Sequence, residues 1–226
     1  MGRVDVRSLE GAAPGYLAFP KEGGGPGVLV LHAWWGLNEV FKGVCDRLAS
    51  AGFVAFAPDL YHGATASTIE VAKGLMSKLR EEDAREDIVK SIKALQGHPN
   101  VRGEGLGVIG FSMGAYWALL IAEEFPKDIA AVVLFYGTGE AKYAKARAAF
   151  LGHFAEKDPY ESAGYIQEVE KSLRGIGREV TFHTYPGTTH WFFESNRPDA
   201  YDATAARAAW ERTMKFLTTH LLPKKS

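Results

Sequence analysis

A serine between two glycines, in the stretch GVIGFSMGAYWALL (residues 107–120), is the first feature that suggests chemistry. An apolar, strand-like run ends at Gly110, and a helix-like segment begins just after Ser112. A Gly-x-Ser-x-Gly turn between a strand and a helix can hold the serine as an exposed nucleophile, while the glycines let the two elements approach each other. The alternative is an ordinary tight turn, so the pattern needs support from other residues.

A serine nucleophile needs a base and an acid that orients the base, here expected in the chain order Ser, Asp, His. Asp158 follows the strand-like run AAFLGHF (148–154), and His190 follows the run EVTFHTYP (179–186). Both positions come just after expected strand ends, where open α/β sheets build their sites. We therefore predict Ser112 as the nucleophile, His190 as its base and Asp158 as the orienting acid.

Rival acids and bases fit this order less well. Glu156 and Glu161 lie close to Asp158 and compete with it for the same role. His32 lies at a strand end before the serine, and His153 and His183 lie inside expected strands. The other three histidines, His62, His98 and His220, lie in loops or the tail.

Two backbone N–H groups are expected to stabilise the oxyanion of an acyl-transfer reaction. One is that of Met113, and the other lies in the turn LHAWWGLN, where we favour Trp34 and keep Ala33 as the alternative. Three aromatic residues near expected strand ends, Trp35, Tyr136 and Trp191, are predicted to line the substrate pocket. Core packing is the competing explanation for each of them.

Short apolar runs alternate with longer amphipathic segments, which predicts βαβ units, a doubly wound and mostly parallel sheet, and helices on both of its faces. With no repeat and no linker, we expect a single domain over residues 1–226. The expected strands are 27–32, 53–58, 105–111, 129–137, 148–154 and 179–186, with an antiparallel edge strand at 15–20, and the expected helices are 38–51, 68–95, 113–125, 160–175 and 200–220.

The composition favours a small-molecule substrate over a charged macromolecule. The 226 residues are 46% hydrophobic and 23% charged, with a formal net charge of −1, so we expect neither nucleic acid nor a membrane as partner. One cysteine, Cys45, excludes an internal disulfide and a multi-cysteine metal site, and it is expected to be a buried structural thiol. Without a hydrophobic leader or span in the sequence, we expect a cytoplasmic monomer or small homo-oligomer.

Several segments in order resemble the dienelactone hydrolase family, small α/β-hydrolases without a lid domain. They are HAWWGLN after the first parallel strand, GFVAFAPDLYHG (52–63), the serine turn, EKD, and YPGTTHWF followed by the final helix. The resemblance implies an α/β-hydrolase fold and hydrolysis of an ester or lactone through a covalent acyl-enzyme. It also implies that neither a cofactor nor a metal is needed.

Three positions depart from the family's best-known members. Ser112 stands where those members carry a cysteine nucleophile, and Ala33 stands where they carry a glutamate that activates the thiol. The two changes agree, since a serine triad has no need of that glutamate. Glu194 stands where enzymes that bind the anionic dienelactone carry an arginine. A charged Glu194 would repel an anion, so we expect a neutral ester or lactone instead.

Three other readings stay open. Acyl transfer or thioester cleavage would use the same triad and differ only in the acceptor or the bond cleaved. A non-catalytic binding protein on the same scaffold would be expected to lose at least one of Ser112, Asp158 and His190, yet all three are present in order. Thiol chemistry at Cys45 would require an activity that survives loss of Ser112.

Overall fold

The computed structural model describes residues 9–139 and 143–222. The chain divides into two compact units, residues 1–106 and 107–226, so the single domain over 1–226 stays a prediction. Residues 1–8, on which the expected absence of a leader partly depends, lie outside the described residues.

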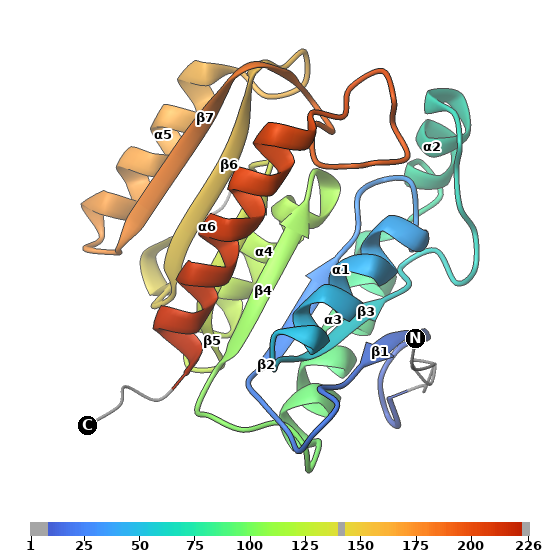
Figure 1. The fold of residues 1–226 in the computed structure, drawn as a ribbon, viewed down its shortest axis with the longest axis vertical. Coiled ribbons are helices and arrows are strands. Elements are labelled where there is room, and N and C mark those ends of the chain that lie inside the picture. The colour runs from blue at the N-terminus through green and yellow to red at the C-terminus, as the bar shows by residue number, and fades with distance from the viewer. Residues whose placement is uncertain (1–8, 140–142, 223–226) are drawn as a thin grey trace. The chain divides into compact units, whose positions relative to one another are not determined.

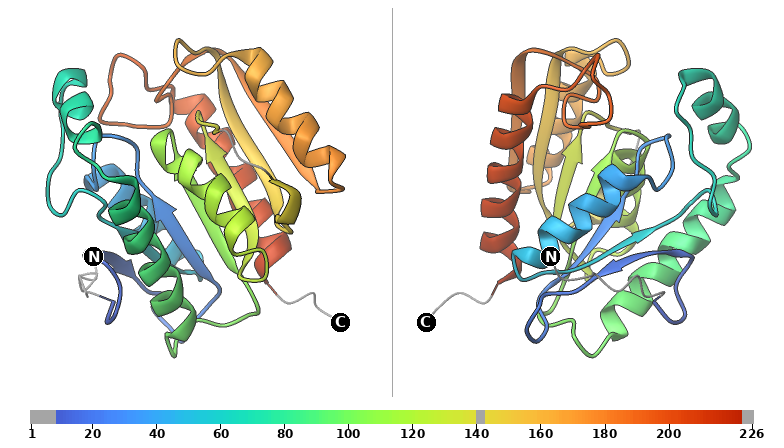
Figure 2. Two further views of the ribbon diagram at one scale, coloured as in Figure 1. Left: turned by 180° about the vertical axis from the view of Figure 1, so that it is seen from behind. Right: turned by 45° about the vertical axis from the view of Figure 1, so that its right-hand side comes forward.

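The first unit places three strands beside three helices in its described part. The strand order is β1-β3-β2, with β1 antiparallel and β2 parallel to β3, as expected for an edge strand near the N-terminus. Helices α1 and α3 lie on opposite faces of these strands (Figures 1 and 2). The elements are β1 Gly15–Ala18, β2 Gly27–Leu31, α1 Glu39–Ser50, β3 Val54–Pro58, α2 Ile69–Met76 and α3 Glu81–Gly97.

The helix expected over 68–95 is in fact two helices, so that prediction was wrong. Helix α2 ends at Met76 and α3 begins at Glu81, with Arg80 between them in an extended conformation at ψ 133°. Only Ala72 of α2 is buried, whereas α3 buries a regular apolar stripe. Packing therefore stabilises α3 along its length, while α2 gains little from the core and ends early.

The second unit holds four strands in the order β4-β5-β6-β7. Strands β5 and β6 pair in parallel, as do β6 and β7. Helices α4 and α5 cover one face and α6 covers the other, as the two sides of Figures 1 and 2 show. The elements are β4 Leu106–Phe111, α4 Met113–Glu124, β5 Ile129–Phe135, the 3-10 turn Tyr143–Lys145, β6 Ala149–Lys157, α5 Ala163–Gly175, β7 Val180–Thr189 and α6 Ala203–Leu221.

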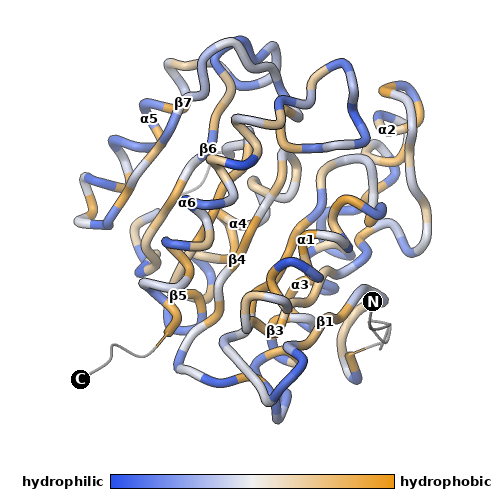
Figure 3. The backbone as a smooth tube through the Cα atoms, in the orientation of Figure 1, coloured by the Kyte–Doolittle hydropathy of each residue, from blue (hydrophilic) through white to orange (hydrophobic). Residues whose placement is uncertain are grey.

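Strands that are buried on both faces need apolar residues throughout. All six residues of β4 are buried, and six of the seven residues of β5 are buried. The hydrophobic colouring of these strands in Figure 3 shows the same continuous apolarity. The predicted α/β class, with mostly parallel strands and helices on both faces, is confirmed.

Candidate active site

Ser112 lies at the turn between β4 and α4 in a backbone conformation that residues other than glycine rarely adopt. Its φ is +50° and its ψ is −112°. The turn is held because the Ser112 N–H donates to the Phe135 carbonyl over 2.9 Å, while the Ala115 N–H donates to the Ser112 carbonyl over 2.8 Å. Strain of this kind persists only where the surroundings enforce it, and it is concentrated at functional sites.

Two glycines make this turn possible. A Cβ at Gly110 would overlap the carbonyl of Gly114 and lie 2.6 Å from the Ala115 Cα. A Cβ at Gly137, just after β5, would lie 2.8 Å from the Ser112 Cα. Both gaps are shorter than a side-chain carbon tolerates, so glycine is needed where β4, α4 and the end of β5 meet.

Strand register brings Asp158 and His190 together. Lys157 at the end of β6 pairs with Thr189 at the end of β7, after a register shift in which β7 contains two extra residues. The next residue along each strand is Asp158 or His190, so neighbouring parallel strands deliver the two side chains to one edge. Strand β7 also runs three residues past the expected end at 186, which places His190 immediately after it.

Hydrogen bonds link the three predicted residues in series. Nδ1 of His190 lies 2.8 and 2.9 Å from the two carboxylate oxygens of Asp158. Because a carboxylate only accepts, Nδ1 carries the proton and Nε2 is left as an acceptor. The Ser112 hydroxyl then donates to Nε2 over 2.9 Å. The side chains of His190 and Asp158 are only 3% and 2% exposed, so water competes little for these bonds.

The loop after β6 orients Asp158. The backbone N–H groups of Tyr160 and Glu161 both donate to Asp158 Oδ1, over 2.9 and 3.2 Å. The Glu161 carboxylate accepts from the N–H and the hydroxyl of Thr138, which fixes this loop to the segment after β5. Glu156, the other rival acid, accepts from the N–H of Gly187. Both rival carboxylates thus accept hydrogen bonds that fix the loops around the site.

The rival histidines have other partners. His32 is fully buried, contacts the Ala33 carbonyl through Nδ1 and accepts from the Leu60 N–H. His153 is fully buried between the hydroxyls of Tyr185 and Thr213. His62 is bonded to Asp87 on the surface. Burial lowers the pKa of both His32 and His153, which favours their neutral forms and a structural role.

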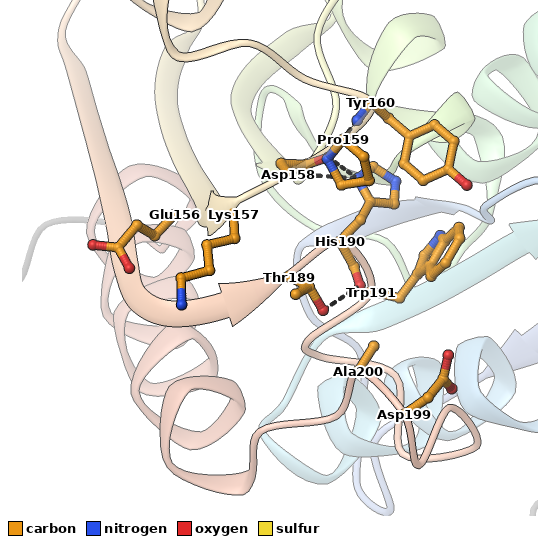
Figure 4. A pocket seen from close by; sticks show the side chains of 10 residues that line it. All are labelled: Glu156, Lys157, Asp158, Pro159, Tyr160, Thr189, His190, Trp191, Asp199 and Ala200. Carbon is orange, nitrogen blue, oxygen red and sulfur yellow. Dashed lines mark hydrogen bonds and ion pairs between the residues drawn. The ribbon is translucent and has the colours of Figure 1, made fainter.

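Aromatic rings surround His190. Tyr160 and Trp191 have ring centroids 4.9 and 5.0 Å from the imidazole, and Figure 4 shows them on the same side of His190. A pocket of about 570 Å³ is lined by both rings together with Asp158, Thr189 and His190. Trp191 is 6% exposed and adopts a φ of +68°, whereas Tyr160 is 48% exposed. Sequence analysis missed Tyr160, although its place two residues after Asp158 was a usable signal.

Tyr136 and Glu194 form a buried pair next to His190. The Tyr136 hydroxyl donates to Glu194 Oε1 over 2.8 Å, and the Tyr136 ring lies 5.0 Å from the imidazole. Both residues are 0% exposed. Burial raises the pKa of Glu194 to about 8, against smaller opposing effects of Tyr136 and Arg197. The carboxyl is therefore largely neutral at pH 7, and the negative charge that the sequence analysis assigned to it is mostly absent there.

The residues predicted to form the oxyanion hole and the substrate pocket lie in both units. Met113 is the first residue of α4, directly after Ser112. Trp34 and Trp35 lie in the first unit after β2, with their rings 5.4 Å apart, and Trp35 is 1% exposed. The oxyanion roles of Met113 and Trp34, with Ala33 as the alternative, stay predictions, as do the substrate contacts of Trp35, Tyr136 and Trp191.

The described residues contain neither a metal-binding cluster nor a membrane-spanning helix. Among residues 9–139 and 143–222, no group of three or more His, Cys, Asp or Glu side chains is arranged to hold a metal ion. In the same ranges, no helix combines the length and apolarity needed to cross a bilayer.

Comparison with known proteins places this chain among hydrolases. The family model described as "Dienelactone hydrolase family" matches residues 13–221. "Protein usf" of Aquifex pyrophilus is 37% identical over 92% of this chain and 93% of its own length. A "Putative carboxymethylenebutenolidase" of Aquifex aeolicus is 33% identical over the same shares of the two chains.

A solved structure shares the fold over nearly the whole chain. It is named "Putative Dienelactone Hydrolase", from Klebsiella pneumoniae, and superposes with a TM-score of 0.81 at 25% identity. The match covers 92% of this chain and 93% of the other. The predicted α/β-hydrolase fold is confirmed.

Proposed function

Because the chain belongs to the dienelactone hydrolase family, we propose that it cleaves small carboxylic esters or lactones through an acyl-enzyme on Ser112. The chain is a hydrolase of a family that acts on small molecules. The finer proposal depends on one observation above all, the hydrogen-bonded series from Ser112 through His190 to Asp158. The name of the relative from Aquifex aeolicus, which refers to a butenolide, supports a lactone or ester as substrate.

The proposed reaction begins at the Ser112 hydroxyl. His190 Nε2 takes the hydroxyl proton as Oγ attacks the carbonyl carbon, and Asp158 stabilises the imidazolium that forms. The tetrahedral intermediate collapses, the alkoxide leaving group takes the proton from Nε2, and the acyl group stays on Oγ. A water molecule then gives a proton to Nε2 as its oxygen attacks the acyl carbon. The bond between the acyl carbon and Ser112 Oγ breaks, Oγ takes the proton back from Nε2, and the acid is released. In a lactone the alcohol stays attached to the acyl group, so a single hydroxy acid is released.

We propose that backbone N–H groups hold the oxyanion. Met113 follows the nucleophile at the N-terminus of α4, where the helix dipole favours negative charge. Trp34 is retained as the second donor on the strength of its position after β2. Acyl transfer differs only in the species that attacks the acyl-enzyme, and no feature of the described residues favours it over hydrolysis.

Intact-mass measurement after treatment with a fluorophosphonate tests the nucleophile, since this reagent needs an activated serine. We expect one adduct on the wild-type protein and none on Ser112→Ala or His190→Ala. His62→Ala is the matched control and should label like wild type, because His62 is an exposed histidine that bonds to Asp87 and not to the predicted triad. A folded wild-type protein that stays unlabelled, or an adduct that survives in Ser112→Ala, would refute the proposal.

A further inference from the structure

Glu194 is a buried titratable group that the proposed acyl transfer does not use. It is 0% exposed and accepts one hydrogen bond, from Tyr136, at Oε1. Its other oxygen, Oε2, is buried and makes no hydrogen bond to any described residue. A carboxyl group that is shielded from solvent and accepts a single hydrogen bond is costly to ionise, so the geometry favours the neutral acid at this place.

Two groups in the described part of the chain act on the ionisation of this carboxyl. Tyr136, at the end of β5, donates its hydroxyl and favours the ionised form, and Arg197, from the same loop as Glu194, also favours it. The Arg197 side chain also lies 5.2 Å from the Trp191 ring and 3.9 Å from Asp199. Asp158 acts on Tyr136 and disfavours ionisation of the phenol. Burial outweighs the two favourable effects and raises the pKa of Glu194 to about 8.

The carboxyl is linked to the catalytic histidine through one residue. One hydrogen bond of 2.8 Å joins it to Tyr136, whose ring centroid is 5.0 Å from that of His190. A charge on Glu194 therefore lies within roughly 10 Å of the imidazole, a range over which buried charges still interact by more than thermal energy.

We propose that the ionisation of Glu194 sets the charge selectivity of the site. When Glu194 is a neutral acid, the site accepts anionic esters. When Glu194 is ionised, it repels anionic esters and affects neutral esters less. The inference rests on the proposed ester hydrolysis, and it makes Glu194 a specificity-determining residue that acts at a distance. Anionic substrates are thus expected to be accepted near pH 6 and disfavoured near pH 10.

The size of the effect follows from the separation of the charges. For a substrate charge bound next to the imidazole, and so roughly 10 Å from Glu194, an effective dielectric constant of about 20 gives a repulsion that lowers kcat/KM on the order of tenfold. The oxyanion of the reaction is common to both substrate classes. Its repulsion by Glu194 therefore cancels in a ratio of two substrates.

The test compares two esters of the same shape, 4-acetoxybenzoate and 4-acetoxybenzamide, which differ by one negative charge. We expect the ratio of their kcat/KM values, anionic over neutral, to fall about tenfold between pH 6 and pH 10, with a midpoint near 8. Because both reactions use His190, its own titration divides out of the ratio. Glu194→Gln should give a constant ratio, and Glu211→Gln, an exposed substitution on α6, should behave like wild type.

A second variant gives the test an independent arm. Tyr136→Phe removes the hydrogen bond that favours the ionised carboxyl, so the midpoint should move to higher pH. A flat wild-type ratio would overturn the inference, as would a fall that persists in Glu194→Gln or a midpoint that does not move in a folded Tyr136→Phe. The proposed function fails separately, if neither ester is hydrolysed or if Ser112→Ala hydrolyses the neutral ester as fast as wild type.

Discussion

Replacing Glu194 by glutamine should stabilise the protein by an amount that grows with pH. The glutamine amide has the shape of the neutral acid and keeps an acceptor for the Tyr136 hydroxyl. The wild-type carboxyl has a pKa raised from 4.5 to about 8 in the folded protein. Because the folded pKa is above the unfolded one, the folded state holds a proton that the unfolded state releases, and the stability it contributes is lost as pH rises through 8.

The magnitude follows from these two pKa values. Each pKa unit corresponds to ~1.4 kcal/mol, so the full effect of Glu194 approaches ~5 kcal/mol between low pH and pH 9. Part of this stability is already lost at pH 5.5, so the free energy of unfolding changes by about 3 kcal/mol between pH 5.5 and pH 9. The advantage of Glu194→Gln in the free energy of unfolding should therefore increase by about 3 kcal/mol over this range.

Urea unfolding followed by tryptophan fluorescence at a series of fixed pH values measures this difference. Glu211→Gln, which alters an exposed glutamate on α6, is the matched control and should track wild type at every pH. A stability difference between Glu194→Gln and wild type that is the same at pH 5.5 and pH 9 would refute the reasoning. It would mean that the buried carboxyl is ionised throughout the range.

Two further predictions concern the geometry of the site. Asp158→Asn should lower kcat by about 10³–10⁴ with little change in KM, because the amide favours the wrong tautomer of His190. Steady-state kinetics on a neutral ester would measure this loss, and a loss of kcat under tenfold would contradict the prediction. Gly110→Ala should lower the melting temperature by several degrees, because its Cβ would overlap the Gly114 carbonyl. Gly43→Ala, in open space on α1, should leave the melting temperature equal or higher, and equal melting of the two variants would count against the packing argument.

Local patterns predicted most of the fold. The buried strands were visible because parallel strands covered on both faces are apolar throughout. The order of Ser112, Asp158 and His190 was visible because each follows a strand, and the structure joins their side chains in one hydrogen-bonded series. The break between α2 and α3 was not visible, since both segments have helical periodicity and only burial distinguishes them.

The roles of two glutamates depend on tertiary contacts that the sequence pattern does not reveal. Glu161 looked like a rival acid, but its carboxylate accepts from Thr138, a partner 23 residues away in the chain. Glu194 was expected to carry a charge that repels anions, and only its complete burial against Tyr136 changes that expectation. A residue type gives the charge that a side chain carries in water, whereas the surroundings decide whether the folded protein keeps it.

The lone cysteine has a practical consequence for experiments on this protein. Cys45 is 0% exposed on the buried face of α1, and burial raises the pKa of its thiol, so the reactive thiolate is scarce. A cysteine introduced at a chosen surface position would then be the one thiol open to maleimide reagents. Fluorescent or spin labels can therefore be attached at single sites without first removing the native cysteine.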